Sequence, residues 1–211
     1  MKKLLSLTLM VSMLAFNAFM LVEGGVANAA EVTNSTTVAG ASTSVDFDVT
    51  VEVTPELSIT CDLDTATMVN AIPGLTGGSA VTSTDCNVKT NNYAGYQLKV
   101  KADNTNALEL LTSSSVYFTD YATATPAAWI TDPTLAQFGF NVTGSDIESA
   151  FSAGYYRGLA GVTDILVAHK DVATTYTGVS TTFNWKAEVG SQHSQETGIY
   201  KADITVTAFS N

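Results

Sequence analysis

The chain has 211 residues, of which 45% are hydrophobic and 14% are charged, and its formal net charge at pH 7 is −11. Such an acidic chain is unsuited to bind nucleic acid or anionic membranes, because their phosphates require lysine and arginine. If the first 29 residues are a leader, about 180 residues remain, enough for one domain with a full hydrophobic core.

The first 29 residues predict an export signal. Lys2 and Lys3 give a basic start, residues 4–22 form an apolar run, and the Ala-Asn-Ala triplet at 27–29 has the spacing of a cleavage site. An uncleaved membrane anchor is the alternative, because the apolar run approaches spanning length. We favour a cleaved signal peptide, since an anchor needs no cleavage site. The sequence therefore predicts a secreted protein of a bacterial cell surface or periplasm, without stable membrane insertion after cleavage.

A flexible arm and a strand are predicted next. Residues 30–43 are small and polar without a period, which is typical of a mobile N-terminal arm. Residues 44–53 then alternate strictly between polar and apolar side chains. Because successive side chains of a strand point to opposite faces, we expect a half-buried strand. It resumes after Pro55 and runs to Cys61. Its apolar positions before the proline are Val45, Phe47, Val49, Val51 and Val53.

The chain contains two cysteines, Cys61 and Cys86. In an exported chain such a pair most simply forms a disulfide. The bridge closes a loop of about 25 residues, and on loop-closure entropy alone it stabilises the fold by roughly 3.5 kcal/mol. We expect it to tether the end of the first strand to the start of a strand around Tyr96.

Alternation and turn residues predict further strands along the rest of the chain. Residues 68–85 are predicted as turns joined by a short extended piece. A capping-box spacing from Ser145 to Glu148 predicts a short helix near 146–151. The last two strands are expected to form an antiparallel hairpin. The expected strands cover residues 96–102, 108–111, 116–118, 126–130, 138–142, 165–167, 183–189 and 200–208.

Seven to ten strands with almost no helix predict an all-β fold, either a sandwich or a barrel. Serine, aspartate and glutamate occupy the outward positions of the first strand, and the middle of the chain lacks regular strand spacing. These features favour an antiparallel β-sandwich. We expect residues 44–211 to form it as a single domain.

Motifs for catalysis are not found. The histidines are His169 and His193, the serines near them lie in polar loops, and no G-x-S-x-G sequence occurs. Both cysteines are better used in a disulfide than as a nucleophile. We therefore expect a protein that is not an enzyme and needs no cofactor.

Metal binding is a weaker alternative. Asp46 and Asp48 share a strand face, and Asp62 and Asp64 follow Cys61, so both pairs offer oxygen ligands that suit calcium. However, the calcium-loop motif D-x-[DN]-x-[DN]-G is missing, and a solvated acidic face explains these pairs equally well. The sequence therefore predicts no metal site, with calcium at an acidic loop left open.

Aromatic residues in the central loops suggest a second function. Trp129, Tyr155 and Tyr156 lie in or near predicted loops. Exposed aromatic rings stack on the apolar faces of sugars, although each ring is also explained by ordinary packing. These three residues are our candidate ligand-binding residues, for a surface adhesin or a carbohydrate-binding sandwich.

The two ends of the chain resemble the bacterial spore-coat-protein-U type of secreted domain, the fold family of archaic chaperone–usher pilins. The resemblance lies in the signal peptide, the strand ending in Ser-Ile-Thr-Cys at 58–61, the Gly/Ser-rich connection to the second cysteine, and the closing TGIYKADITVT at 197–207. It implies an Ig-like, pilin-like sandwich that a neighbour's strand completes, with the N-terminal arm as donor. It also implies a structural subunit of a surface fibre, pilus (fimbrium) or coat, with other copies or fibre subunits as partners.

Overall fold

The computed structural model describes residues 44–122, 124–159 and 161–211, so the predicted signal peptide and arm lie outside it. The chain divides into two units, Met1–Glu52 and Val53–Asn211. All ten described strands belong to the second unit. They are β1 (Leu57–Cys61), β2 (Gly78–Thr90), β3 (Tyr96–Ala102), β4 (Leu108–Leu110), β5 (Ser113–Asp120), β6 (Ala136–Gly144), β7 (Ile165–Lys170), β8 (Val179–Val189), β9 (Tyr200–Lys201) and β10 (Ile204–Ser210).

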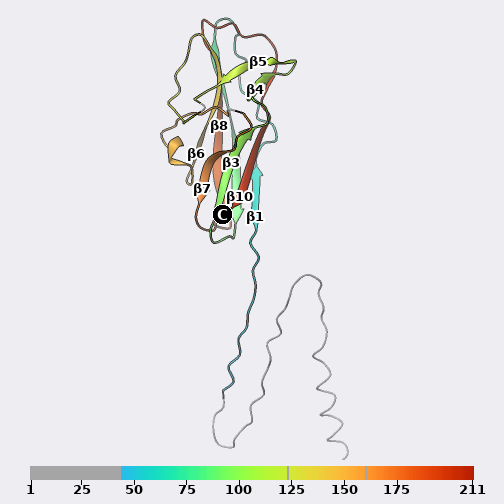
Figure 1. The fold of residues 1–211 in the computed structure, drawn as a ribbon, viewed down its shortest axis with the longest axis vertical. Coiled ribbons are helices and arrows are strands. Elements are labelled where there is room, and N and C mark those ends of the chain that lie inside the picture. The colour runs from blue at the N-terminus through green and yellow to red at the C-terminus, as the bar shows by residue number, and fades with distance from the viewer. Residues whose placement is uncertain (1–43, 123, 160) are drawn as a thin grey trace, which may run out of the picture. The chain divides into compact units, whose positions relative to one another are not determined.

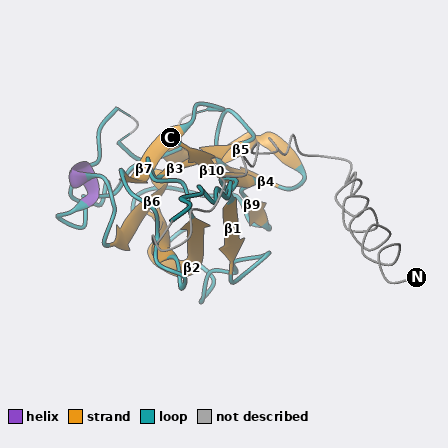
Figure 2. Ribbon diagram, turned by 90° about the horizontal axis from the view of Figure 1, so that it is seen from below, coloured by secondary structure: helices purple, strands orange, loops and turns teal. Residues whose placement is uncertain are grey.

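The strands form two sheets, as Figures 1 and 2 show. The larger sheet has seven strands in the order β1-β2-β8-β6-β5-β4-β9, and the smaller has three in the order β10-β3-β7. Neighbouring strands are antiparallel except β5 and β6, which run parallel. The predicted all-β sandwich is therefore confirmed.

Alternate side chains of the two sheets form the hydrophobic core. Phe140 of β6 lies at its centre, with ring centroids 5.6 Å from Phe151, 6.3 Å from Phe183 and 5.5 Å from Trp185. Burial of each such side chain contributes about 1.5–3 kcal/mol to folding. The smaller sheet covers these aromatics with the fully buried residues of β3, namely Tyr96, Leu98, Val100 and Ala102.

The turn before β3 depends on a glycine. Gly95 has a φ of +84°, and a Cβ there would overlap the carbonyl oxygen of Lys170. Only glycine satisfies both conditions without strain. The strands predicted over 96–102, 138–142 and 165–167 are confirmed as β3 and parts of β6 and β7.

The first strand is shorter than predicted. None of residues 44–56 belongs to a strand, and β1 begins at Leu57. Pro55 has no N–H to donate. The N–H of Glu56 then donates to the side-chain oxygen of Asn91 over 2.6 Å, and regular pairing begins with Leu57 opposite Thr90. The half-buried strand predicted over 44–53 is therefore wrong for the chain by itself.

The longest strand was not predicted. Residues 78–90 form the 13-residue strand β2, which pairs with β8 over eleven residues, from Gly78 opposite Val189 to Val88 opposite Val179. It also pairs with β1, so the disulfide joins two adjacent strands. The expected link to the strand around Tyr96 is wrong, because that strand belongs to the other sheet.

Three smaller predictions are also corrected. The helix near 146–151 is only a 3-10 turn, Ser149–Phe151. Residues 126–130 form no strand, and only Ala127 makes an isolated bridge, to Tyr156. The predicted final hairpin does not form, because β8 lies in the larger sheet and β10 in the smaller.

Among the residues that the structure describes, no helix is long and apolar enough to cross a membrane.

Candidate functional site

Residues 44–53, here called the alternating segment, present their apolar side chains to solvent. The exposed fractions are 60% for Val45, 80% for Phe47, 83% for Val49, 87% for Val51 and 75% for Val53. Single exposed apolar residues are ordinary, but a regular row of five is not. The row has the pattern of a strand with one dry face and no partner strand within the described chain.

A second feature is the side of the sandwich where β1 and β10 lie beside each other, here called the β1/β10 flank (Figure 1). Among the described strands, each of these two ends its sheet and pairs with one neighbour, β1 with β2 and β10 with β3. Their edges therefore offer free backbone hydrogen-bonding groups. The side chains that pack against the core at this flank are only partly buried, and they are Leu57, Ile59, Ile204, Val206 and Ala208.

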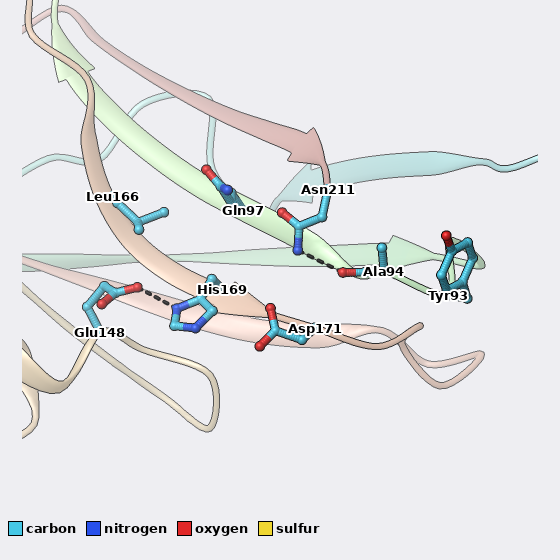
Figure 3. Close-up of a pocket in the computed structure, with 8 residues that line it drawn as sticks. All are labelled: Tyr93, Ala94, Gln97, Glu148, Leu166, His169, Asp171 and Asn211. Atoms are coloured by element: carbon cyan, nitrogen blue, oxygen red, sulfur yellow. Dashed lines mark hydrogen bonds and ion pairs between the residues drawn. The ribbon is translucent and has the colours of Figure 1, made fainter.

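The third feature is an open depression of about 840 Å³, here called the β3/β7 depression (Figure 3). Residues of the paired strands β3 and β7 line it, together with residues from the turn before β3 and from the segments that follow β6, β7 and β10. Figure 3 shows Tyr93 at one end and Glu148 at the other. The lining residues are Tyr93, Ala94, Gln97, Glu148, Leu166, His169, Asp171 and Asn211.

Hydrogen bonds hold part of this lining in place. His169 Nδ1 and Glu148 Oε1 are 2.5 Å apart. The side-chain nitrogen of Asn211 donates to the carbonyl oxygens of Ala94 over 2.8 Å and of Lys170 over 3.0 Å. The side chains of Gln97 and Asp171 make no bond to any other lining residue (Figure 3). The depression thus combines polar side chains that hydrogen bonds hold in place with polar side chains that bond to no other lining residue.

A partly buried ionic group lies next to the depression in the chain, at Lys170. Lys170 Nζ lies 3.1 Å from Asp146 Oδ2, and the hydroxyl of Tyr96 donates to the same oxygen over 3.3 Å. Burial, together with the neighbouring Asp146 carboxylate, raises the pKa of Tyr96 well above its usual value. Tyr96 therefore stays a hydrogen-bond donor at every ordinary pH. Because Lys170 is paired with Asp146, its charge is largely neutralised beside the depression.

The structure brings together two of the three predicted ligand-binding aromatics. The Trp129 and Tyr156 rings meet edge to face at 5.2 Å, and Tyr121 stacks on Trp129 at 4.4 Å. Lys186 Nζ also lies 4.4 Å from the centroid of Trp129. Tyr155 is 39% exposed and is not among the ring partners of Trp129. These contacts occupy the Trp129 ring within the protein, so it serves to pack loops onto the outer face of β6 and β8.

Glu188 anchors this aromatic cluster. Trp129 Nε1 donates to Glu188 Oε2 over 2.8 Å, and Lys186 Nζ lies 2.9 Å from the same oxygen. Burial opposes ionisation of Glu188, but hydrogen bonds from Thr131, Lys186 and Trp129 outweigh it and lower the pKa of this carboxyl. The carboxylate is therefore ionised at neutral pH, and it bonds to groups of the protein itself.

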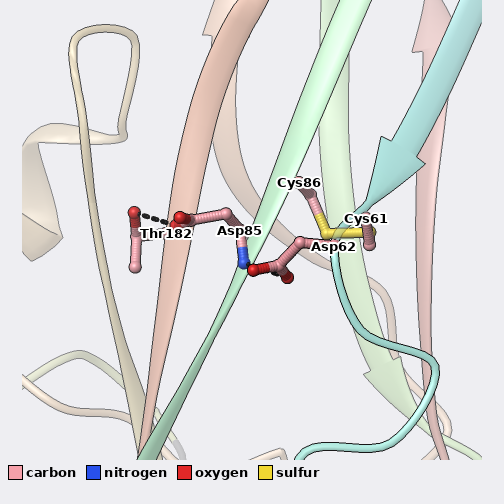
Figure 4. Close-up of a disulfide and its surroundings, with 5 residues drawn as sticks. All are labelled: Cys61, Asp62, Asp85, Cys86 and Thr182. Carbon is pink, nitrogen blue, oxygen red and sulfur yellow. Dashed lines mark hydrogen bonds between the residues drawn. A yellow bond between two sulfur atoms is a disulfide. The ribbon is translucent and has the colours of Figure 1, made fainter.

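The disulfide fixes β1 against β2 (Figure 4). Cys61 and Cys86 face each other in the register, with 4.0 Å between their Cα atoms, and Cys86 is fully buried. Next to the bridge, the Asp62 N–H donates to the Asp85 carbonyl oxygen over 2.9 Å, and the Asp85 N–H donates to Asp62 Oδ1 over 2.9 Å. The predicted pairing of the two cysteines is confirmed.

Asp120 ties two loops together at the end of β5. Its carboxylate accepts hydrogen bonds from the N–H of Ala107 over 3.3 Å and of Leu159 over 3.4 Å. Burial raises the pKa of Asp120 above its usual value, although these two bonds oppose the rise. At pH values just above the ordinary aspartate pKa, the Asp120 carboxyl is therefore protonated more often in the folded than in the unfolded protein.

Replacing Asp120 by asparagine should flatten the pH dependence of stability. In the native protein, the free energy of unfolding should fall as pH rises from the unfolded pKa of this group through its raised folded pKa. The Asp120→Asn variant cannot lose a proton there, so it should not show this fall. Urea unfolding between pH 3 and pH 7 measures the difference. A difference between the two proteins that stays constant with pH would contradict the assignment.

Both histidines make hydrogen bonds to other groups of the fold. His193 contacts the carbonyl oxygen of Thr134 and the side chain of Gln195, each at 3.0 Å, and His169 pairs with Glu148. Within the described ranges, neither histidine is hydrogen-bonded to a serine, and no group of three or more His, Cys, Asp or Glu side chains is placed to hold a metal ion.

Sequence reasoning missed the β3/β7 depression. Its residues come from positions 93–97, 148, 166–171 and 211, and no motif links them. The antiparallel pairing of β3 with β7 brings the strand residues together, and bonds of Glu148 to His169 and of Asn211 to Ala94 add the residues that follow β6 and β10. No protein-family model matches the sequence, and no curated protein matches it.

Proposed function

We propose that the protein is an exported structural subunit of a bacterial surface fibre, pilus or coat, and that it assembles by adding a strand to a second copy of itself. The observation that carries the proposal is the row of five exposed, alternating apolar side chains in the alternating segment. Strand addition combines main-chain hydrogen bonds with pockets for alternate side chains, and this segment has that pattern.

The receiving surface is the β1/β10 flank of the second copy. Its two free edges supply unpaired backbone groups, and its partly buried apolar side chains leave the core open to solvent on that side. The row from Val45 to Val53 extends over roughly 26 Å as a strand, and β10 over roughly 20 Å, so one segment is long enough to cover the edge. The donor strand thus lies after residue 43, beyond the arm that the resemblance implies.

The disulfide supports an extracytoplasmic location. Stable disulfides form in oxidising compartments and are rare in the cytosol. Cys61–Cys86 is such a bridge, and it agrees with the predicted signal peptide.

Two matched deletions test the proposal in the same chain. Removing residues 44–53 should leave a folded protein that stays monomeric, because the donor row is gone, whereas removing residues 30–43 should leave assembly intact. Size-exclusion chromatography with light scattering, followed by negative-stain microscopy, distinguishes monomers from fibres. Assembly of both variants would exclude the alternating segment as donor. Loss of assembly in the 30–43 deletion alone would move the donor into the arm.

A further inference from the structure

The β3/β7 depression is chemically separate from the assembly surfaces proposed above. It opens on the smaller sheet between β3, β7 and the residues that follow β7 and β10 (Figure 3). Its volume, about 840 Å³, lies in the range of small-molecule sites, roughly 300–1,000 Å³. Its wide opening suits one unit of a longer ligand better than an enclosed small molecule.

The charge of the lining disfavours acidic ligands. Neither lysine nor arginine is among the eight lining residues. Lys170 is paired with Asp146, and Lys99, which lies opposite Leu166 in the register, places its ammonium group 4.8 Å from the centroid of the Phe209 ring. His169 is already bonded to Glu148, and the Asp171 carboxylate adds negative charge. A carboxylate, sulfate or phosphate group would meet no lysine or arginine among the lining residues and would be repelled by the carboxylates of Glu148 and Asp171, so the depression favours a neutral or positively charged ligand.

The hydrogen-bonding groups favour a ligand with many hydroxyls. Asp171 and the free oxygens of Glu148 and Asn211 are acceptors, and the Gln97 amide both donates and accepts. Both hydrogens of the Asn211 amide are used by backbone carbonyl oxygens, so its oxygen has a fixed direction. A carboxylate accepts through two adjacent oxygens, and an amide accepts through its oxygen and donates through its nitrogen. Each can therefore bond to two neighbouring hydroxyls of a sugar ring.

The depression also offers apolar surface that a sugar ring can contact. Leu166 and Ala94 provide apolar area between the polar groups, and the Tyr93 ring at one end is 88% exposed. A pyranose ring has apolar C–H faces that pack on such surfaces, while its hydroxyls point sideways to polar groups. An exposed tyrosine is also a low-entropy anchor for binding.

We propose that the β3/β7 depression is a carbohydrate-binding site for sugars without acidic groups, with Tyr93 as the stacking residue and with Gln97 and Asp171 as the hydroxyl-binding residues. The site differs from the aromatic cluster around Trp129, whose rings and carboxylate are used within the protein. The inference does not depend on the assembly proposal, because neither the alternating segment nor the β1/β10 flank lines the depression.

A glycan array followed by calorimetry tests the proposal. The full chain should bind neutral or amine-bearing oligosaccharides in preference to those with sialic or uronic acids. In the variants Tyr93→Ala, Gln97→Ala and Asp171→Ala the dissociation constant of the best oligosaccharide should rise about tenfold or more. Tyr176→Ala is the matched control, since Tyr176 is 96% exposed and lies outside the depression.

The remaining outcomes overturn the proposal. Absence of binding to every glycan, preference for acidic glycans, or equal binding by all four variants would each exclude it. The thermal midpoint of each variant checks that the fold is unchanged, because none of the three residues belongs to the buried core. A deletion of residues 44–53 should bind the same glycans as the full chain. Failure of assembly and failure of sugar binding are therefore separate results.

Discussion

Aspartate at Phe47 and Val49 should abolish assembly without changing the stability of the monomer. Both side chains are at least 80% exposed in the single chain, so their replacement alters no buried contact there, and the free energy of unfolding should stay within about 0.5 kcal/mol. In the assembled state the same positions face the core of a neighbour. An unpaired carboxylate buried there costs several kcal/mol, and each 1.4 kcal/mol weakens binding tenfold.

The alternation of the segment supplies the matched control. Ser44→Asp with Thr50→Asp adds the same charge at positions of opposite parity, which lie on the outward face of an added strand. This variant should assemble like the native protein in light scattering and microscopy. Equal loss of assembly in both double variants would indicate a general charge effect and contradict strand addition. Normal assembly of Phe47→Asp with Val49→Asp would contradict it as well.

The alternating segment shows what a sequence pattern specifies and what it leaves open. The period of two across 44–53 predicts one dry and one wet face, and the exposed apolar row has that pattern. Periodicity does not specify which chain covers the dry face. Pro55 already marks an interruption in the sequence, but only the structure shows the bond from Glu56 to Asn91 and the start of regular pairing at Leu57.

β2 was missed for a different reason. Its inward positions include Thr82 and Thr84, and its outward positions include Val81, so the alternation of hydrophobicity is weak. The strand is specified by pairing with β1 on one side and β8 on the other. Long-range pairing of this kind overrides local preference. The cysteine pair was predictable because the chain offers only one combination.

The wrong hairpin has a topological cause. Residues 190–197 are polar and of a length that suits a hairpin, but the chain from 190 to 203, which includes β9, crosses from the larger sheet to the smaller. On the way they bond to distant segments, with the N–H of Gln192 donating to Pro133 and that of Gln195 donating to Gly74, over 2.7 and 2.9 Å. A connection that crosses to the other sheet and one that returns to the same sheet can have the same amino-acid composition. For this reason β8 was predicted correctly as a strand but with the wrong partner. The single strand predicted over 200–208 is two strands, β9 in the larger sheet and β10 in the smaller.

The candidate sites, too, were predictable from the sequence only where the signal is local. Trp129 and Tyr156 were identified in the sequence as loop aromatics, and they do meet, but their partners Tyr121 and Lys186 come from other elements. The β3/β7 depression has no local signal, because its two strands are separated by more than sixty residues along the chain. Residues that act through proximity in the fold are not found by spacing alone.

Removal of the disulfide should have the largest effect on the stability of the single chain. The Cys61→Ala, Cys86→Ala variant should lose about 3.5 kcal/mol of unfolding free energy, because the bridge restricts a loop of 25 residues in the unfolded chain. β1 should be affected first, since among the described strands it pairs only with β2. Urea unfolding of the oxidised protein and the variant measures the loss.

Reduction provides the control and links this stability to assembly. A thiol reductant should lower the stability of the native chain to that of the double variant, and it should leave the variant itself unchanged. Because residues 44–56 lead directly into β1, loosening β1 also loosens the attachment of the donor strand and one edge of the receiving flank. Fibres of the variant should therefore dissociate at lower urea than native fibres. A loss below about 1 kcal/mol would mean that strand pairing alone holds β1 in place.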